Sequence, residues 1–243
     1  MENIENASID YTRHYQNWHA DTPEHTKKVI LFYKENILKE FPTNKESNIL
    51  EIGCGMGFLL LALQESGYKN VKGIDVDKGQ VASCQKKGLM VDLVEDSIDY
   101  LQKNKDTFDT IVAFDVLEHI PPAFQIAFTK AIYEALKKEG VFLATVPNAS
   151  SFLASRNRYI DYTHYVTFSE ISLDFVLYNG GFKDIDIQEM DHVRFSLSPA
   201  RFLHWLLLKY VRLSRRITFI AELGFKQALK VPLSFNLMSK ARK

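Results

Sequence analysis

The 243-residue chain has only two cysteines, Cys54 and Cys84, and they form no C-x-x-C pair. This scarcity argues against a fold held by disulfides and fits a reducing compartment. The first six residues, Met1 to Asn6, have neither a basic start nor an apolar segment, so they do not resemble a secretory signal. Internal repeats and low-complexity linkers are absent as well. We therefore expect a cytoplasmic protein with one ordinary hydrophobic core.

The chain has no net charge, but its charges are unevenly distributed. Residues 195–243 contain ten Lys or Arg against one acid, Glu222, a net charge of +9. The first 194 residues contain twenty Lys or Arg against twenty-nine acids, a net charge of −9. The C-terminal part therefore has a different surface from the rest of the chain.

The most informative segment is Asn48-Ile-Leu-Glu-Ile-Gly-Cys-Gly-Met-Gly57, in which an apolar strand runs into a turn with three glycines. Without Cβ atoms, such a turn lets a ligand approach the backbone. The N–H groups that open the following helix favour a carboxylate or phosphate. Asp75, which ends the next predicted strand, is placed to accept both hydroxyls of a ribose. The segment predicts a site for an adenosine-containing cofactor.

The glycine spacing separates two classes of cofactor. A dinucleotide site requires G-x-G-x-x-G, and Phe58 stands where the third glycine would be. NAD and FAD are therefore disfavoured. The run Glu51-x-Gly53-x-Gly55-x-Gly57 with Asp75 resembles the S-adenosylmethionine (SAM) site of the class I methyltransferases.

Later segments resemble the same family in the same order. Val94-Glu-Asp-Ser97 is similar to its adenine-contacting turn, the segment from Phe108 to Ile120 to its fourth strand and the loop behind it, and Gly140 to Pro147 to its fifth strand. The resemblance implies SAM as cofactor and S-adenosylhomocysteine as product. The implied cofactor residues are Glu51, Gly53, Gly55 and Gly57 in the turn, Asp75 at the ribose, Asp96 and Ser97 at the adenine, and Asp115 at the methionine end.

The alternation of predicted helices and strands favours a doubly wound α/β fold in a single domain, 1–243. Strands are predicted near 48–52, 71–75, 90–94, 109–114 and 141–146, with helices near 22–40, 58–66, 78–87, 97–103 and 122–138. By resemblance, strands near 182–189 and 234–241 complete a seven-stranded, mostly parallel sheet with an antiparallel last strand. A helix is predicted between 167 and 180. Thr167 and Glu170 form a capping box at its start, and Gly180-Gly181 ends it. Its apolar stripe consists of Ile171, Leu173, Val176 and Leu177.

Two loops hold the candidate catalytic residues, because ligands of open α/β sheets bind beyond the carboxyl ends of the strands. The first loop is Asp115-Val-Leu-Glu-His119, and the second runs from Arg156 to His164. We expect His164 to act as general base, although a structural histidine bonded to a loop carbonyl is the alternative. Asp161 would orient the imidazole or bind substrate hydroxyls, and His119 is a weaker candidate for catalysis. Acceptor binding is expected from Arg156, Arg158, Tyr159 and Tyr162.

A metal site is not expected. The residues Asp115, Glu118, His119, Asp161 and His164 include ligand types that suit Mg²⁺, but they form no compact ligand motif.

The acceptor is suggested by short resemblances. The segment Asp161-Tyr-Thr-His164 ahead of Thr-Phe-Ser is similar to one in methyltransferases that act on sugars in bacterial surface-glycan pathways. That likeness implies O-methylation of a sugar hydroxyl in a polysaccharide or glycan precursor. The Leu-Glu-His triplet at 117–119 recurs in quinone-ring O-methyltransferases, so a quinone or other phenol is the alternative acceptor. A protein that binds SAM without transferring methyl, as partner of another enzyme, is the alternative from another class.

The N-terminal region, 1–42, is predicted to form a lid followed by a helix. Residues 11–19 are rich in aromatic side chains. They would fold over the cofactor and exclude water, or alternatively pack as core aromatics. Thr22 caps the helix and Pro23 occupies its first position.

Residues 192–232 are predicted to be a basic amphipathic helical insertion between the last two strands. At 100° per residue, six basic side chains lie within about 140° of the helix surface, namely Arg201, His204, Lys209, Arg212, Arg215 and Arg216. The longest uncharged run, Phe202 to Leu208, is too short to span a bilayer. Segment 198–230 would therefore pack on its own domain or in a homodimer, attach to an anionic inner membrane face, or bind a lipid-linked glycan. Nucleic acid is not expected.

Overall fold

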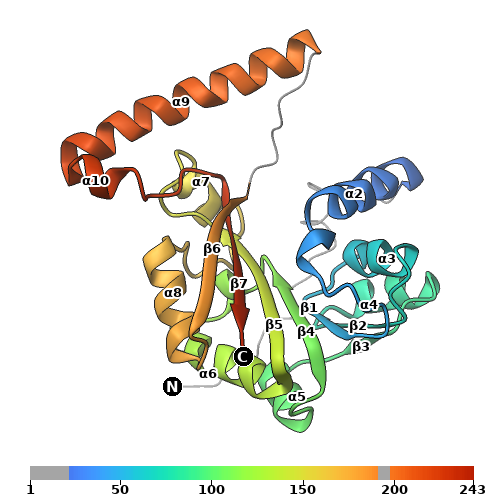
Figure 1. Ribbon diagram of the computed structural model, residues 1–243. Helices are drawn as coiled ribbons and strands as arrows, with labels where there is room; N and C mark the ends of the chain where they lie inside the picture. Colours follow the sequence, from blue (N-terminus) through green and yellow to red (C-terminus); the bar gives the residue numbers. More distant parts are fainter. Residues whose placement is uncertain (1–21, 191–197) are drawn as a thin grey trace, which may run out of the picture.

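The computed structural model describes residues 22–190 and 198–243. Their strands form one seven-stranded sheet in the order β3-β2-β1-β4-β5-β7-β6 (Figure 1). The strands are β1 (Asn48–Ile52), β2 (Asn70–Asp75), β3 (Val91–Leu93), β4 (Phe108–Phe114), β5 (Leu136–Pro147), β6 (Asp184–Met190) and β7 (Asn236–Arg242). Only β7 runs antiparallel to its neighbours, β5 and β6, in this sheet of the described residues. The predicted doubly wound, mostly parallel sheet with an antiparallel last strand is confirmed.

Helices follow most of the strands, as the α/β alternation predicts. They are α2 (Pro23–Asn36), the 3₁₀ turn η1 (Leu38–Glu40), α3 (Phe58–Glu65), α4 (Lys78–Lys86), α5 (Ser97–Lys103), the 3₁₀ turn η2 (Leu117–His119), α6 (Pro122–Ala135), α7 (Ala154–Tyr159), α8 (Glu170–Asn179), α9 (Pro199–Leu223) and α10 (Phe225–Ala228). The last two connect β6 to β7, where the sequence predicts a helical insertion.

The sheet has a hydrophobic core on each face. In β1, Leu50 and Ile52 pack into a core with residues of α5, α6 and α8, whereas Ile49 packs into a second core with residues of η1, α3 and α4. This alternation follows from the period of two along a strand. Each large apolar side chain buried in this way contributes about 1.5–3 kcal/mol to the stability of the fold.

Two predicted helix ends are wrong. The first helix begins as predicted, with Oγ1 of Thr22 accepting a hydrogen bond from the N–H of His25, but it ends at Asn36 rather than near 40. The chain then tightens into η1, which buries Ile37 and Phe41. Likewise, α6 ends at Ala135 rather than near 138, because the chain passes directly into β5 and pairs with β4.

The predicted capping box of α8 is also wrong. Ser169 caps the helix, and its hydroxyl accepts from the N–H of Ser172 at 3.1 Å while the Ser172 hydroxyl accepts from the N–H of Ser169 at 2.9 Å. The helix starts later than predicted because Phe168 still forms a parallel bridge with Asn148. In the predicted stripe, Leu173, Val176 and Leu177 are buried, but Ile171 is exposed.

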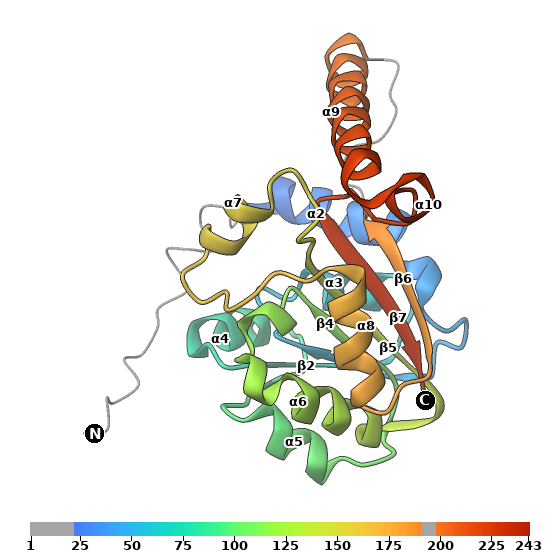
Figure 2. The ribbon, with the colours of Figure 1, turned by 90° about the vertical axis from the view of Figure 1, so that its left-hand side faces the viewer.

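Ligands of open α/β sheets bind at the carboxyl ends of the parallel strands, so the elements at this end position the candidate site. There α2, α7, α9 and α10 lie at one end of the sheet, and α9 projects beyond the rest of the domain (Figures 1 and 2). In the described parts of the chain, no helix combines the length and apolar character needed to cross a membrane.

Candidate functional site

The glycine turn leads from β1 into α3 in a backbone conformation that favours glycine. The φ angles of Gly53, Gly55 and Gly57 are 67°, 50° and 75°, a region that residues with a Cβ adopt only with strain. A Cβ at Gly53 would also lie 2.7 Å from Cγ2 of Val116, and one at Gly57 would overlap Cδ1 of Leu89. The positive φ angles favour glycine at all three positions, and at Gly53 and Gly57 a Cβ would also displace a neighbouring side chain.

Asp75, the last residue of β2, holds this turn from the neighbouring strand. Its Oδ2 accepts a hydrogen bond from the N–H of Gly55 at 2.8 Å, and its Oδ1 accepts one from the N–H of Asp77 at 2.9 Å. Burial raises the pKa of Asp75. Its role at ribose hydroxyls stays a prediction, and the structure adds a role in shaping the turn.

Asp96 and Ser97 begin α5. The Oδ1 atom of Asp96 accepts hydrogen bonds from the N–H groups of Ile98 and Asp99, at 2.9 and 3.1 Å, and so caps the helix. The contact with adenine stays a prediction, and the cap explains why an aspartate suits position 96 without it.

A cavity of about 310 Å³ lies at the carboxyl ends of β1, β4 and β5. Its walls come from α2, the glycine turn, η2, the segment after α7 and the start of β7. The lining residues are Tyr33, Glu51, Gly53, Cys54, Met56, Phe58, Leu59, Phe114, Asp115, Glu118, His119, Pro147, Asn157, Ile160, Asp161, His164, Phe235 and Asn236. The structure thus brings both predicted catalytic loops to the glycine turn.

Glu51 presents a buried acid to this cavity. Its side chain lies near the end of β1, and in the described part of the chain its Oε2 has no hydrogen-bond partner. Burial raises its pKa well above the ordinary value, and the nearby Cys84 and Asp75 raise it further. A buried carboxylate costs free energy unless it is paired, so this position suits the ammonium group of a ligand.

Asp115 follows β4 in a strained conformation, with a φ of 53°. The Thr145 hydroxyl donates a hydrogen bond to its Oδ1 at 3.1 Å, and Nδ2 of Asn236 donates another to the same oxygen at 3.2 Å. Residues in such strained conformations cluster at functional sites. The two hydrogen bonds to Oδ1 hold Asp115 in the cavity wall beside the glycine turn despite this strain.

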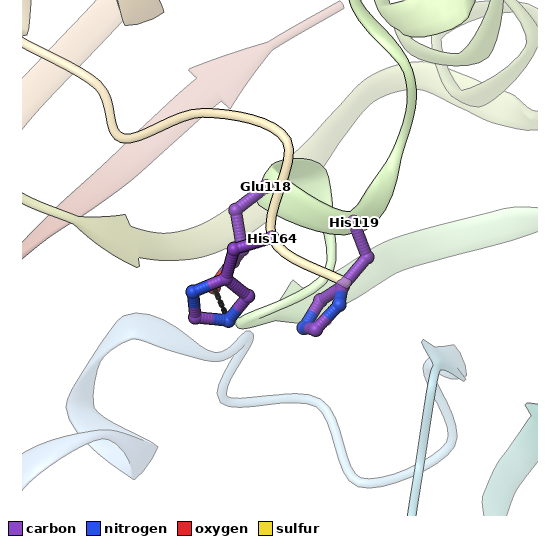
Figure 3. Close-up of side chains that lie close together, drawn as sticks. All are labelled: Glu118, His119 and His164. Atoms are coloured by element: carbon purple, nitrogen blue, oxygen red, sulfur yellow. Dashed lines mark ion pairs between the residues drawn. The ribbon is translucent and has the colours of Figure 1, made fainter. Parts of the chain in front are cut away.

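Glu118 and His164 form a close pair in the cavity wall (Figure 3). The Glu118 side chain is fully buried, and its Oε1 lies 4.0 Å from Nε2 of His164. Neither carboxylate oxygen has a hydrogen-bond partner among the described residues. Burial raises the pKa of Glu118 well above its ordinary value, and the carboxylates of Asp115 and Asp161 add to the rise.

The orientation of His164 is set by a backbone carbonyl. Its Nδ1 lies 2.7 Å from the carbonyl oxygen of Asn157, which can only accept, so Nδ1 carries the proton and Nε2 is the basic nitrogen of the neutral ring. The bond to a loop carbonyl, the structural alternative for His164, is therefore present, and the role of Nε2 as general base stays a prediction.

Asp161 acts on the other histidine. Its Oδ1 accepts hydrogen bonds from the N–H and the hydroxyl of Thr163, at 2.8 and 2.7 Å. The Thr163 oxygen in turn lies 2.8 Å from Nδ1 of His119. The rings of His119 and His164 meet edge to face with centroids 4.6 Å apart. Asp161 is therefore linked through Thr163 to His119, whereas the sequence linked it to His164.

The side chains of Glu118, His119 and His164 can together hold a cation. One ligand atom from each of Glu118, His119 and His164 lies within 4.8 Å of the other two. Two imidazoles and one carboxylate form a donor set that several divalent metals accept. The expectation of no metal stays a prediction, and chelation tests it directly.

The predicted acceptor residues lie outside the cavity lining. Tyr159 and Tyr162 are exposed, and the guanidinium of Arg158 lies 5.2 Å from the ring centre of Tyr159. Instead, Asn157 and Ile160 from the same segment line the cavity, because a helical turn directs neighbouring side chains to different sides. Arg156, Arg158, Tyr159 and Tyr162 form the outer surface of this cavity wall.

Several lining residues could not be found from the sequence. Phe235 and Asn236 come from the start of β7, more than a hundred residues beyond Asp115, and no motif marks them. Glu118 carried a signal, since it is an acid beside His119 in the loop that follows a buried strand. The predicted lid, at 11–19, lies outside the described residues.

Comparison with known proteins agrees with this geometry. The model of a methyltransferase domain family matches residues 24–210. A probable S-adenosylmethionine-dependent methyltransferase of Mycolicibacterium smegmatis is 27% identical over 145 residues, which are 60% of this chain and 55% of that protein. A ubiquinone biosynthesis O-methyltransferase of Nitrosococcus oceani is 36% identical over 105 residues, 40% of this chain and 43% of that one. The chain thus spans about half the length of these curated relatives.

Solved structures show the same fold. A SAM-dependent methyltransferase of Archaeoglobus fulgidus has a TM-score of 0.68 at 20% identity, covering 96% of this chain and 100% of that one. A Haemonchus contortus phosphoethanolamine N-methyltransferase in complex with SAM has a TM-score of 0.61 at 18% identity. The match covers 97% of this chain and 60% of that one. With the matching domain model, they show that the chain belongs to the family of class I SAM-dependent methyltransferases.

Proposed function

We propose that this protein transfers the methyl group of SAM to a hydroxyl oxygen, with His164 as the general base. The observation that carries the proposal is the pair formed by His164 and the buried Glu118 in the same cavity as the glycine turn. Removal of the hydroxyl proton is the one task that SAM itself cannot perform.

The cofactor side of the cavity fits SAM. Glu51 has a buried carboxylate oxygen that needs a partner, which the ammonium group of a methionine moiety supplies. The glycine turn allows a ligand close to the backbone at the start of α3, and Asp75 holds that turn. When bound, SAM supplies a methyl group that its sulfonium already activates, so the protein has to align the acceptor behind it.

The acceptor side supplies the base. The Nε2 atom of His164 is the basic nitrogen, and the carbonyl of Asn157 fixes the ring. A proton taken from the acceptor hydroxyl passes to Nε2, and the Glu118 carboxyl group, 4.0 Å away, lies close enough to stabilise the charged imidazolium that results. Burial raises the pKa of Glu118, and a positively charged imidazolium beside it favours its ionised form.

A phenolic acceptor fits the described cavity best. Tyr33, Phe58, Phe114, Ile160 and Phe235 give the cavity aromatic and apolar walls, which suit a planar ring. Relatives named ubiquinone biosynthesis O-methyltransferases support the same class of acceptor.

A sugar hydroxyl, the acceptor that the sequence favours, is the second candidate. Its support is the polar and aromatic outer surface of the wall formed by Arg156, Arg158, Tyr159 and Tyr162. A glycan larger than the cavity would extend over this surface.

The test is a product assay with methyl-labelled SAM and a panel of catechols, quinol precursors, nucleotide sugars and glycans. We expect label in a methyl ether on a phenolic hydroxyl. Label in a sugar methyl ether supports the second candidate, and label on nitrogen or carbon contradicts both. Tight SAM binding with no transfer to any acceptor supports a non-catalytic SAM-binding partner instead.

A further inference from the structure

The helix α9 is long and exposed, and it projects from its own domain. It has 25 residues and none of them is buried, so it presents a rod of about 37 Å. It projects beyond the sheet in both views (Figures 1 and 2). Near its C-terminal end, the Arg216 side chain donates hydrogen bonds to the carbonyls of Ala228 and Val231, the latter at 2.7 Å. The helix is therefore fixed at one end and exposed along most of its length.

The side of α9 that faces solvent most fully is apolar. Six side chains with exposed fractions between 48% and 70% form this apolar face, namely Leu203, Leu206, Leu207, Tyr210, Leu213 and Ile217. At 100° per residue they lie within about 120° of the helix surface. Beyond the helix, Phe225 and Leu229 are exposed as well. A contiguous apolar surface of this kind marks a site of interaction.

Positive charge borders the apolar face. Residues 199–230 contain seven Lys or Arg and a single acid, Glu222. On the helical wheel, Lys209 and Arg216 flank the face on one side, and His204 and Arg215 on the other. Long basic side chains can reach along an apolar surface and keep their charges in the polar layer. The surface that would complement α9 is thus apolar inside and anionic outside.

We propose that α9 and α10 dock on an anionic lipid membrane. The apolar face enters the boundary between headgroups and acyl chains, and the exposed basic side chains Lys209 and Lys226 contact lipid phosphates, while Arg216 holds the helix to the segment after α10. The helix lies on the membrane, because no described helix can cross one. Pairing of α9 with α9 of a second copy is less favourable, since it would bring two equally basic surfaces together.

Docking in this way brings the cavity to the membrane. The segment after α10 is tied to the sheet by Asn148, whose Nδ2 donates to the carbonyls of Pro232 and Ser234 at 3.0 and 2.9 Å. The next residues, Phe235 and Asn236, line the cavity. The docking helix and the cavity therefore share one end of the sheet, where an acceptor dissolved in the bilayer is accessible.

The experiment is flotation of the full chain with vesicles of phosphatidylcholine, with or without phosphatidylglycerol. We expect binding that needs phosphatidylglycerol and weakens with salt. The exposed triple variant Arg201→Glu, Lys209→Glu, Lys226→Glu should bind about a hundredfold more weakly. The matched control Lys78→Glu, Lys86→Glu, Lys138→Glu makes the same change of charge on exposed lysines elsewhere and should bind as the wild type does.

A second variant tests the apolar face. Leu206→Glu with Leu213→Glu should abolish vesicle binding, while Ile171→Glu with Phe175→Glu, on the exposed side of α8, should leave it unchanged. Unchanged SAM binding by calorimetry shows that each variant is folded. The proposal is overturned if the wild type fails to bind anionic vesicles at low salt. It is also overturned if the double variant Leu206→Glu, Leu213→Glu still binds vesicles. A third contradicting result is a wild-type dimer that does not bind vesicles and that this double variant dissociates into monomers.

Discussion

The Nε2 atom of His164 lies 4.0 Å from Oε1 of Glu118, an acid whose side chain is fully buried and whose two oxygens have no hydrogen-bond partner among the described residues. A buried acid left in this state destabilises a protein when it ionises. Such a cost is common at functional sites, where a group is held ready for chemistry.

Glu118→Gln should make the protein more stable and less active. The raised pKa of Glu118 in the fold means that its favourable contribution is complete below the unfolded pKa of about 4.3 and is lost as pH rises through the folded pKa. Glutamine does not ionise, so the variant does not lose stability in this way as pH rises. The difference in Tm between variant and wild type should therefore grow from pH 4 to pH 8. A difference that shrinks over this range would show that Glu118 is stabilised as a carboxylate.

Gly53→Ala should destabilise the protein by about 1–3 kcal/mol, because it adds backbone strain and overpacking. The new Cβ would lie 2.7 Å from Cγ2 of Val116 at a φ of 67°. Adding Val116→Ala to the Gly53→Ala variant should recover only the part of the lost stability that comes from the clash. Denaturant unfolding of the two single variants and the double variant measures this coupling. Strictly additive effects would contradict the contact.

Asp75→Ala should weaken SAM binding and lower stability by about 1–3 kcal/mol, because two backbone N–H groups lose their acceptor. Asp92→Ala, which breaks only the surface pair with Lys72, is the control and should change stability by less than about 1 kcal/mol. Calorimetry with SAM and thermal unfolding check both. Normal SAM binding by Asp75→Ala would remove the ribose assignment.

Chelation with EDTA should leave methyl transfer unchanged, in line with the expectation of no metal. The arrangement of Glu118, His119 and His164 makes the test informative, since their ligand atoms lie within 4.8 Å of one another. Loss of transfer that Mg²⁺, Mn²⁺ or Zn²⁺ restores would give these residues a role as metal ligands.

The parts of the site that the sequence predicted are those that follow from local pattern. Apolar runs predict the strands, the glycines mark a turn with positive φ, and the ends of consecutive parallel strands predict that Glu51, Asp115 and His164 meet. Periodicity is less informative at helix ends, so it missed the tightening at Ile37 and the early start of β5.

What the sequence could not predict depends on tertiary contacts. The link from Asp161 through Thr163 to His119 joins residues more than forty positions apart. The contribution of Asn236 depends on where β7 enters the sheet. Which face of α9 is exposed depends on how Arg216 ties the helix to Ala228 and Val231. Contacts of this kind leave no mark in local sequence pattern.

The central claim is tested most directly by the rate of methyl transfer from bound SAM in His164→Gln, with His204→Gln on the exposed helix α9 as control. We predict that His164→Gln binds SAM as the wild type does but transfers methyl about 10²–10⁴-fold more slowly, while His204→Gln is unaffected. Transfer at the wild-type rate by His164→Gln would contradict the assignment of His164 as the base.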